Sequence, residues 1–199
     1  IYRGEFIMIE FKENNNFYII TGGPGVGKTT LLEELKNRGY STVPEIAREL
    51  IKEEQSRNGN ALPWKDKNLY KEVMFNRSIN SFEQVYKTLN ISNKSPIFFD
   101  RGFLDTICYA KLIQSEIDEQ MELYAENWRY NENIFILPPW QKIYETDTER
   151  KQEWTEAVLT YEKMCETYSS YGYNIVEIPK IAVRKRVDFI LKFIKELHR

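Results

Sequence analysis

The stretch FYIITGGPGVGKTT, residues 17–30, decides the fold of this chain. Residues 22–29 match every fixed position of the pattern G-x-x-x-x-G-K-[ST]. An apolar, β-prone run at 17–21 precedes the pattern, and a helical pattern at 28–38 follows it and stops at Gly39. A strand, a glycine-rich turn and a helix in that order are the context in which this motif forms a phosphate-binding loop.

Each part of this loop has a physical task in holding a triphosphate. Glycine removes the Cβ atom so that backbone N–H groups can converge on an anion, at the positive end of the following helix. We expect Lys28 to reach the β- and γ-phosphates, Thr29 to ligate Mg²⁺, and Thr30 to contact the α-phosphate. The residues expected to bind the nucleotide are Gly22, Gly23, Pro24, Gly25, Val26, Gly27, Lys28, Thr29 and Thr30.

Composition excludes several classes of function. A net charge of −2 gives no overall attraction to nucleic acid, and the cluster 184–186 (Arg-Lys-Arg) is explained by a solvated helix face. We find no apolar run long enough to cross a membrane and no signal peptide, and we expect a cytoplasmic protein with reduced cysteines. The single histidine, His198, excludes Ser-His-Asp, Cys-His and multi-histidine metal chemistry. Any general base must therefore be a carboxylate.

Five short apolar runs alternate with helical patterns along the chain. Such alternation predicts an α/β fold with a parallel sheet and right-handed crossovers. We expect one domain over residues 8–199, since 1–7 resemble a cloning remnant ahead of Met8. The predicted strands are 17–21, 40–43, 96–100, 133–137 and 173–178, and the predicted helices are 28–38, 45–57, 65–90, 103–113, 120–130, 151–170 and 181–197.

A polar stretch at 138–150 follows the fourth predicted strand. Such a stretch is typical of a lid over a phosphate site, and also of an ordinary surface loop. We expect a lid at about 138–150, with Arg150 as a candidate lid arginine.

Charged side chains stand where the second and third predicted strands end. The second delivers Glu45, with Arg48 about one helical turn later, and the third delivers Asp100 and Arg101, followed by Asp105. Ligands of open α/β sheets bind at the carboxyl ends of the strands. We therefore expect these five side chains to lie near the phosphate loop.

Each of these side chains has a chemical interpretation and a plainer one. Asp100 follows four apolar residues, as an acid that holds Mg²⁺ does, or it caps the next helix. Arg101 could clamp the moving phosphoryl group or form a surface ion pair, and Glu45 could accept a substrate proton or pair with a helix N-terminus. Arg48 could bind a substrate anion or a neighbouring acid. Asp105 could orient Arg101 or a sugar hydroxyl, or be an exposed helix acid.

Together these motifs resemble a known family. The phosphate loop, residues 43–49, residues 98–102 with Asp105, and the loop at 147–150 are similar to the AAA-domain family of small P-loop NTPases related to the ribosylnicotinamide kinase domain of the bacterial NAD regulator. More distantly, they resemble deoxynucleoside and thymidylate kinases. The resemblance covers roughly residues 15–195.

The resemblance implies a five-stranded parallel sheet in the order 2-3-1-4-5, and ATP or GTP with Mg²⁺. Gly102 departs from the pattern, because deoxynucleoside kinases have Ser there. No convincing arginine finger or sensor residue of an oligomeric motor is recognisable. By position, the catalytic candidates are Lys28, Glu45, Asp100, Arg101 and Arg150, the substrate candidates are Glu45, Arg48 and Asp105, and the metal candidates are Thr29 and Asp100.

Three functions agree with these residues. The preferred one is a phosphotransferase that moves the γ-phosphate of ATP·Mg²⁺ to a small hydroxyl- or phosphate-bearing acceptor of nucleoside-like or other type, with Glu45 or Asp100 as the base. The second is an ATP- or GTP-dependent switch that acts on a protein or lipid partner, and the third is an NTPase without an acceptor. No Asn-Lys-x-Asp guanine signature is present, which favours ATP. The acceptor and the oligomeric state are left open.

Overall fold

The computed structural model describes residues 9–88, 95–143 and 154–198. The central sheet has five parallel strands in the order β3-β4-β2-β6-β7. Counted along the chain, these are the five predicted strands in the order 2-3-1-4-5, so the predicted architecture is confirmed. The strands are β2 (Phe17–Gly22), β3 (Ser41–Val43), β4 (Ile97–Asp100), β6 (Asn133–Leu137) and β7 (Asn174–Glu177).

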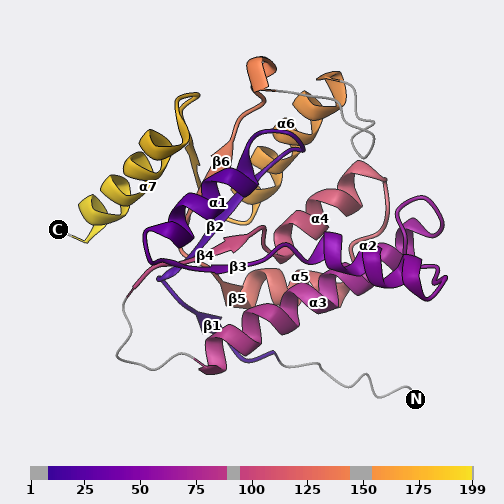
Figure 1. Cartoon of the computed structure of the whole chain (residues 1–199). Coiled ribbons are helices and arrows are strands. Elements are labelled where there is room, and N and C mark those ends of the chain that lie inside the picture. The colour runs from indigo at the N-terminus through magenta and orange to yellow at the C-terminus, as the bar shows by residue number, and fades with distance from the viewer. Residues whose placement is uncertain (1–8, 89–94, 144–153, 199) are drawn as a thin grey trace.

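Helices cover both faces of this sheet (Figure 1). On one face α1 (Lys28–Asn37) and α7 (Val183–Leu197) lie side by side. On the other face α4 packs between α3 and α6, and α2 extends the same side by packing on α3. The helices of this second side are α2 (Ile46–Ser56), α3 (Lys67–Thr88), α4 (Phe103–Leu112), α5 (Glu119–Asn127) and α6 (Trp154–Ser170).

Strand β2 shows why the sequence folds in three layers. Its residues are all buried, because it is the middle strand and both of its faces are covered. Phe17 and Ile19 belong to the core under α3 to α6, whereas Tyr18 and Ile20 belong to the core under α1 and α7. A continuous apolar run is the pattern expected of such a parallel strand.

The sequence missed a second, two-stranded sheet. Strand β1 (Lys12–Glu13) pairs in parallel with β5 (Trp128–Arg129). Helix α5 therefore ends at Asn127, and the predicted end at residue 130 is wrong. Trp128 is buried in the core and donates its indole N–H to the carbonyl of Glu10. Strands of two residues are too short to show a period in the sequence.

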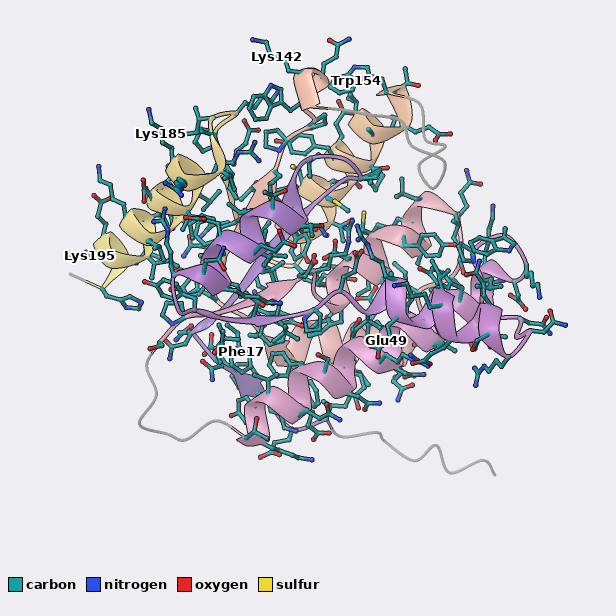
Figure 2. The ribbon with its side chains drawn as sticks, in the orientation of Figure 1. Phe17, Glu49, Lys142, Trp154, Lys185 and Lys195 are labelled. Carbon is teal, nitrogen blue, oxygen red and sulfur yellow. The ribbon has the colours of Figure 1, made fainter. Side chains whose placement is uncertain are left out.

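The predicted lid falls only in part within the described residues. After β6 the chain continues to the short 3₁₀ helix η1 (Gln141–Ile143), whereas residues 144–150, including Arg150, lie outside the described part. Lys142 and Trp154 stand on either side of that gap (Figure 2). Within the described ranges, no helix is long and apolar enough to cross a membrane.

Candidate functional site

The phosphate loop is shaped by glycines in left-handed backbone conformations. Gly22, Gly25 and Gly27 have φ angles of +150°, +75° and +84°. Residues with a Cβ atom rarely adopt such angles. At Gly22 a Cβ atom would also lie 2.8 Å from the carbonyl oxygen of Leu137, which belongs to the neighbouring strand β6. The loop conformation therefore depends on these glycines.

The first turn of α1 is prepared for an anion. Its N-cap is Gly27, no side chain caps it, and no acidic residue lies in the first turn. Backbone N–H groups at such a helix end need an acceptor, and the helix dipole favours a negative one. Thr29 and Thr30 are exposed at this end, whereas Lys28 is buried, with 6% of its surface exposed.

Lys28 contacts two carboxylates that come from neighbouring strands. Its Nζ lies 2.5 Å from Oδ1 of Asp100 and 3.9 Å from Oε2 of Glu45. Burial and the charge of Arg101 lower the pKa of Lys28, and burial and the charge of Glu45 raise the pKa of Asp100, against the attraction between the two groups. A phosphate and a metal ion, which bring charges of both signs, can replace this pair.

Glu45 lies among three cations. Its carboxylate accepts a hydrogen bond from Nε of Arg101 at 2.8 Å, and it lies 3.4 Å from Nε of Arg48 and 3.9 Å from Nζ of Lys28. Burial alone would raise the pKa of Glu45, but these positive charges and the hydrogen bond from Arg101 lower it. Glu45 is therefore ionised at neutral pH and can accept a hydrogen bond or a proton.

Arg101 is held in an unusual backbone conformation. Its φ angle is +72°, in the left-handed region, which costs a residue other than glycine about 1–2 kcal/mol. Its backbone N–H donates to the carbonyl of Ile20, and its guanidinium donates to Glu45 and, at 3.0 Å, to Asp105. Burial alone would lower the pKa of Arg101, but the two carboxylates raise it. Strained residues of this kind are concentrated at functional sites.

Asp105 joins three elements through one buried carboxylate. Its Oδ1 accepts hydrogen bonds from Oγ1 of Thr21 at 2.5 Å and from Nη1 of Arg101 at 3.0 Å. Its Oδ2 accepts from the backbone N–H of Gly102 at 3.0 Å and from the hydroxyl of Tyr168 at 2.6 Å. The side chain is 5% exposed, so the interpretation as an exposed helix acid is wrong. Asp105 fixes Arg101 between β2 and α6.

Arg186 also differs from its expected position. The sequence placed it with Arg184 and Lys185 on a solvated helix face, but Arg186 is buried and its guanidinium lies 4.8 Å from the centre of the Trp140 ring. It donates to the carbonyl of Ile181 at 2.6 Å and to that of Val26 at 3.4 Å. Lys185, by contrast, projects from the outer side of α7 (Figure 2). Arg186 therefore stabilises the phosphate loop through its hydrogen bond to the carbonyl of Val26.

A cleft opens beside this cluster, between α2, α3 and the β4–α4 turn. Its charged end contains the Glu45 and Asp100 that contact Lys28, so the cleft borders the phosphate loop. The remaining walls are largely apolar. The residues that line it are Val43, Pro44, Glu45, Ile46, Ala47, Met74, Ser78, Ser81, Phe99, Asp100, Arg101, Gly102, Asp105 and Tyr130.

The donor set fits a Mg²⁺ ion that arrives with a nucleotide. Among the residues that the structure describes, no group of three or more His, Cys, Asp or Glu converges on a metal position. Thr29 is exposed in the first turn of α1, and the Asp100 carboxylate lies 2.5 Å from Nζ of the preceding residue, Lys28, so both are candidate oxygen ligands. Mg²⁺ takes six oxygen ligands, and phosphate oxygens and water commonly supply most of them.

Comparison with known proteins identifies the family. Residues 17–186 match the family described as an AAA domain, and no curated protein matches the chain. Among solved structures, a deoxyadenosine kinase from M. mycoides with products dCMP and dCDP bound superposes with a TM-score of 0.59 at 18% identity, covering 90% of this chain and 99% of that one.

Two further structures share the fold. The NadR protein in complex with NR has a TM-score of 0.57 at 18% identity, and the match covers 94% of this chain but 51% of that one. YorR from Bacillus subtilis has a TM-score of 0.52 at 13% identity, with 92% and 98% covered. The family match spans most of the sequence, and the chain therefore belongs to the AAA domain family, with the parallel α/β fold of P-loop kinases.

Proposed function

We propose that this protein is a phosphotransferase that moves the γ-phosphate of ATP, bound with Mg²⁺, to a hydroxyl group of a small molecule. One observation carries the proposal: Glu45 and Asp100 both contact Lys28 and both line the cleft. A single charged cluster thus faces the phosphate loop on one side and the cleft on the other. A site that brings a donor and an acceptor together requires this arrangement.

The donor side would be formed by α1 and its loop. The N–H groups after Gly27 would hold the phosphates, and Lys28 would turn from Asp100 to the β- and γ-phosphates. Thr29 and Asp100 would hold the Mg²⁺, which when bound neutralises part of the triphosphate charge. Each of these steps replaces a contact between two side chains of the protein with one to a ligand.

The acceptor side would be formed by Glu45 and Arg101. Glu45 would orient the acceptor hydroxyl and take its proton as the oxygen bonds to the γ-phosphorus and the bond to the β-phosphate oxygen breaks. Arg101, kept charged by its carboxylate partners, would offset the negative charge of the moving group. Arg150, as a lid residue, would have the same task.

Two arguments support a kinase that uses ATP. The fold is shared with deoxyadenosine kinase, although identity of 18% leaves the acceptor of this chain undefined. The sequence has no guanine signature, which favours ATP over GTP. A cytoplasmic location, where ATP is abundant and thiols such as Cys108 remain reduced, belongs to the same proposal.

The test is ATP turnover with Mg²⁺, measured with and without a panel of nucleosides and other small alcohols. We expect ADP formation that an acceptor stimulates, together with a phosphorylated product identified by mass spectrometry. GTP in place of ATP measures the base preference in the same assay. Tight ATP binding with slow turnover that no acceptor stimulates would contradict the proposal and favour a nucleotide-dependent switch.

A further inference from the structure

The charges of the cleft are already paired within the protein. Its lining contains the carboxylates of Glu45, Asp100 and Asp105 and the guanidinium of Arg101. Arg101 donates one hydrogen bond to Glu45 and one to Asp105, at 2.8 and 3.0 Å. Its side chain is 20% exposed, and these two hydrogen bonds fix where the guanidinium lies. The cation inside the cleft is thus shared by two acids.

The two neighbouring cations, Lys28 and Arg48, are also paired with carboxylates of the protein. Lys28 is paired with Asp100, and both are assigned to the triphosphate and its metal ion. Arg48 stands at the rim, where its side chain is 61% exposed and lies 3.4 Å from Glu45. When Lys28 and Asp100 turn to the nucleotide, they remove one positive and one negative charge. The described residues around the acceptor position then still hold as many negative charges as positive ones.

A phosphate ester would add negative charge to a position where the positive and negative charges are equal in number. It carries close to two negative charges at neutral pH and would have to take Arg101 from Glu45 or Asp105. Either carboxylate would be left buried without its partner, which is expensive in a site of low dielectric. An uncharged hydroxyl group needs only an acceptor for its hydrogen, and the ionised Glu45 provides one.

The uncharged walls indicate what the rest of the acceptor is like. Phe99, Tyr130, Met74 and Ile46 present apolar surface to the cleft, and Ser78 adds a hydroxyl group. These walls fit a compact apolar or aromatic body.

We infer, building on the proposed phosphotransferase function, that the acceptor is an uncharged hydroxyl compound with an apolar or aromatic part, and not a phosphate ester. The protein would thus perform the first phosphorylation of its substrate. A kinase that extends an existing monophosphate would need a free cation at the position where Arg101 is shared by Glu45 and Asp105.

The experiment compares matched acceptors on the full chain. Uncharged nucleosides and vitamin-like alcohols are each paired with their own phosphate ester, and ATP-dependent product formation is measured for both members. We expect kcat/KM to be at least tenfold higher for the uncharged member of every pair that reacts. Equal or faster transfer to a phosphate ester would overturn the inference and leave the phosphotransferase function standing. No transfer to any acceptor would refute that function and the inference with it.

A binding measurement gives a second, independent readout. Thymidine and thymidine 5′-monophosphate are titrated by calorimetry into the protein saturated with a non-hydrolysable ATP analogue and Mg²⁺. Glu45→Gln removes one negative charge and releases Arg101, so we expect it to tighten monophosphate binding at least fivefold and to change thymidine binding less. Glu49→Gln, an exposed acid on the same helix, should change neither (Figure 2). Monophosphate binding to the wild-type protein as tight as thymidine binding would contradict the inference.

Discussion

The phosphate loop and the acceptor cleft are built in different ways. The loop is one short stretch, residues 22–29, whose shape depends on glycine backbone angles and on the start of α1. The cleft cluster comes from the ends of β3 and β4, from α4 and from α6, and depends on ion pairs between side chains. Backbone groups therefore hold the donor, and paired charges shape the acceptor position.

This difference predicts two kinds of sensitivity. At the loop, the addition of a Cβ atom should lower stability and ATP affinity, and the loss of one lysine should lower turnover. At the cleft, stability and transfer should fall after any change that leaves one member of a charge pair without its partner. An unpaired buried charge destabilises the protein more than the loss of the whole pair.

The largest effect is expected for Lys28→Ala. This change removes the cation assigned to the β- and γ-phosphates, and we expect transfer to fall by about a thousandfold or more. Lys36→Ala, an exposed lysine on the same helix α1, is the matched control and should keep normal turnover. Steady-state ADP formation measures both, with circular dichroism to show that the chain is folded. Normal turnover by the Lys28 variant would remove the loop from the account.

A glycine series tests the backbone half of the comparison. Gly22→Ala combines a φ of +150° with a Cβ position 2.8 Å from a backbone oxygen, and should lower the free energy of unfolding by about 2–4 kcal/mol. Gly39→Ala has a φ of +87° but no described atom within 4 Å, and should cost about 1 kcal/mol. Gly23→Ala, with its nearest atom at 3.6 Å, should cost less than about 0.5 kcal/mol.

Urea denaturation of the three variants measures this order directly. ATP affinity should fall for Gly22→Ala and stay unchanged for Gly39→Ala, which lies at the other end of α1. Equal stability of the Gly22 and Gly39 variants would show that the approach to strand β6 is not what requires glycine in the loop.

A smaller effect is expected at the positioning residues of the cleft. Tyr168→Phe removes one hydrogen bond from the buried Asp105 and should cost about 1–3 kcal/mol of stability. Because Asp105 then holds Arg101 less firmly, kcat should fall several-fold while the KM for ATP stays unchanged. Tyr171→Phe, which removes a hydroxyl bonded to Glu122 on a more exposed part of the same region, should leave kcat unchanged. Equal effects of the two variants on kcat would contradict the role of Asp105.

The smallest effect is expected from pH. The charges of Arg101 and Lys28 outweigh burial and hold the pKa of Glu45 below its usual value near 4.3. The ionised form therefore stabilises the fold and the site at neutral pH, and this contribution is lost only as pH falls through the lowered pKa. With saturating ATP·Mg²⁺, which keeps Asp100 ionised, kcat should change less than about twofold between pH 6 and 7.5. An acidic limb centred near pH 6 would argue against Glu45 as the base.

The central sheet and the phosphate loop, which are encoded by continuous stretches of sequence, were predictable from the sequence. The run 17–21 and the loop after it predicted the central strand, the phosphate loop and α1, and the later apolar runs predicted the other four strands. The order of the strands in the sheet came from the resemblance to P-loop kinases. The prediction succeeded because parallel strands buried on both faces are continuous apolar runs, and because the loop needs glycine at fixed positions.

The side-chain cluster of the cleft, whose members are far apart in the sequence, was predictable only in outline. Strand ends placed Glu45, Arg48, Asp100 and Arg101 near one another, and the structure brings them together. The partnership of Asp105 with Tyr168, 63 positions later, depends on how α6 packs against α4, which no local pattern encodes. Burial of a charged residue such as Arg186 also depends on tertiary packing, because basic helix residues are mostly exposed.

The most direct test of the account is Glu45→Gln, measured for ATP affinity and for phosphate transfer in the same preparation. Glu45 belongs to the acceptor half, so the account predicts a transfer rate at least a hundredfold lower and an ATP dissociation constant within about threefold of wild type. Glu49→Gln should match wild type in both measurements. Full transfer activity in the Glu45 variant, or loss of ATP binding equal to its loss of transfer, would contradict the division of the site into a donor loop and an acceptor cleft.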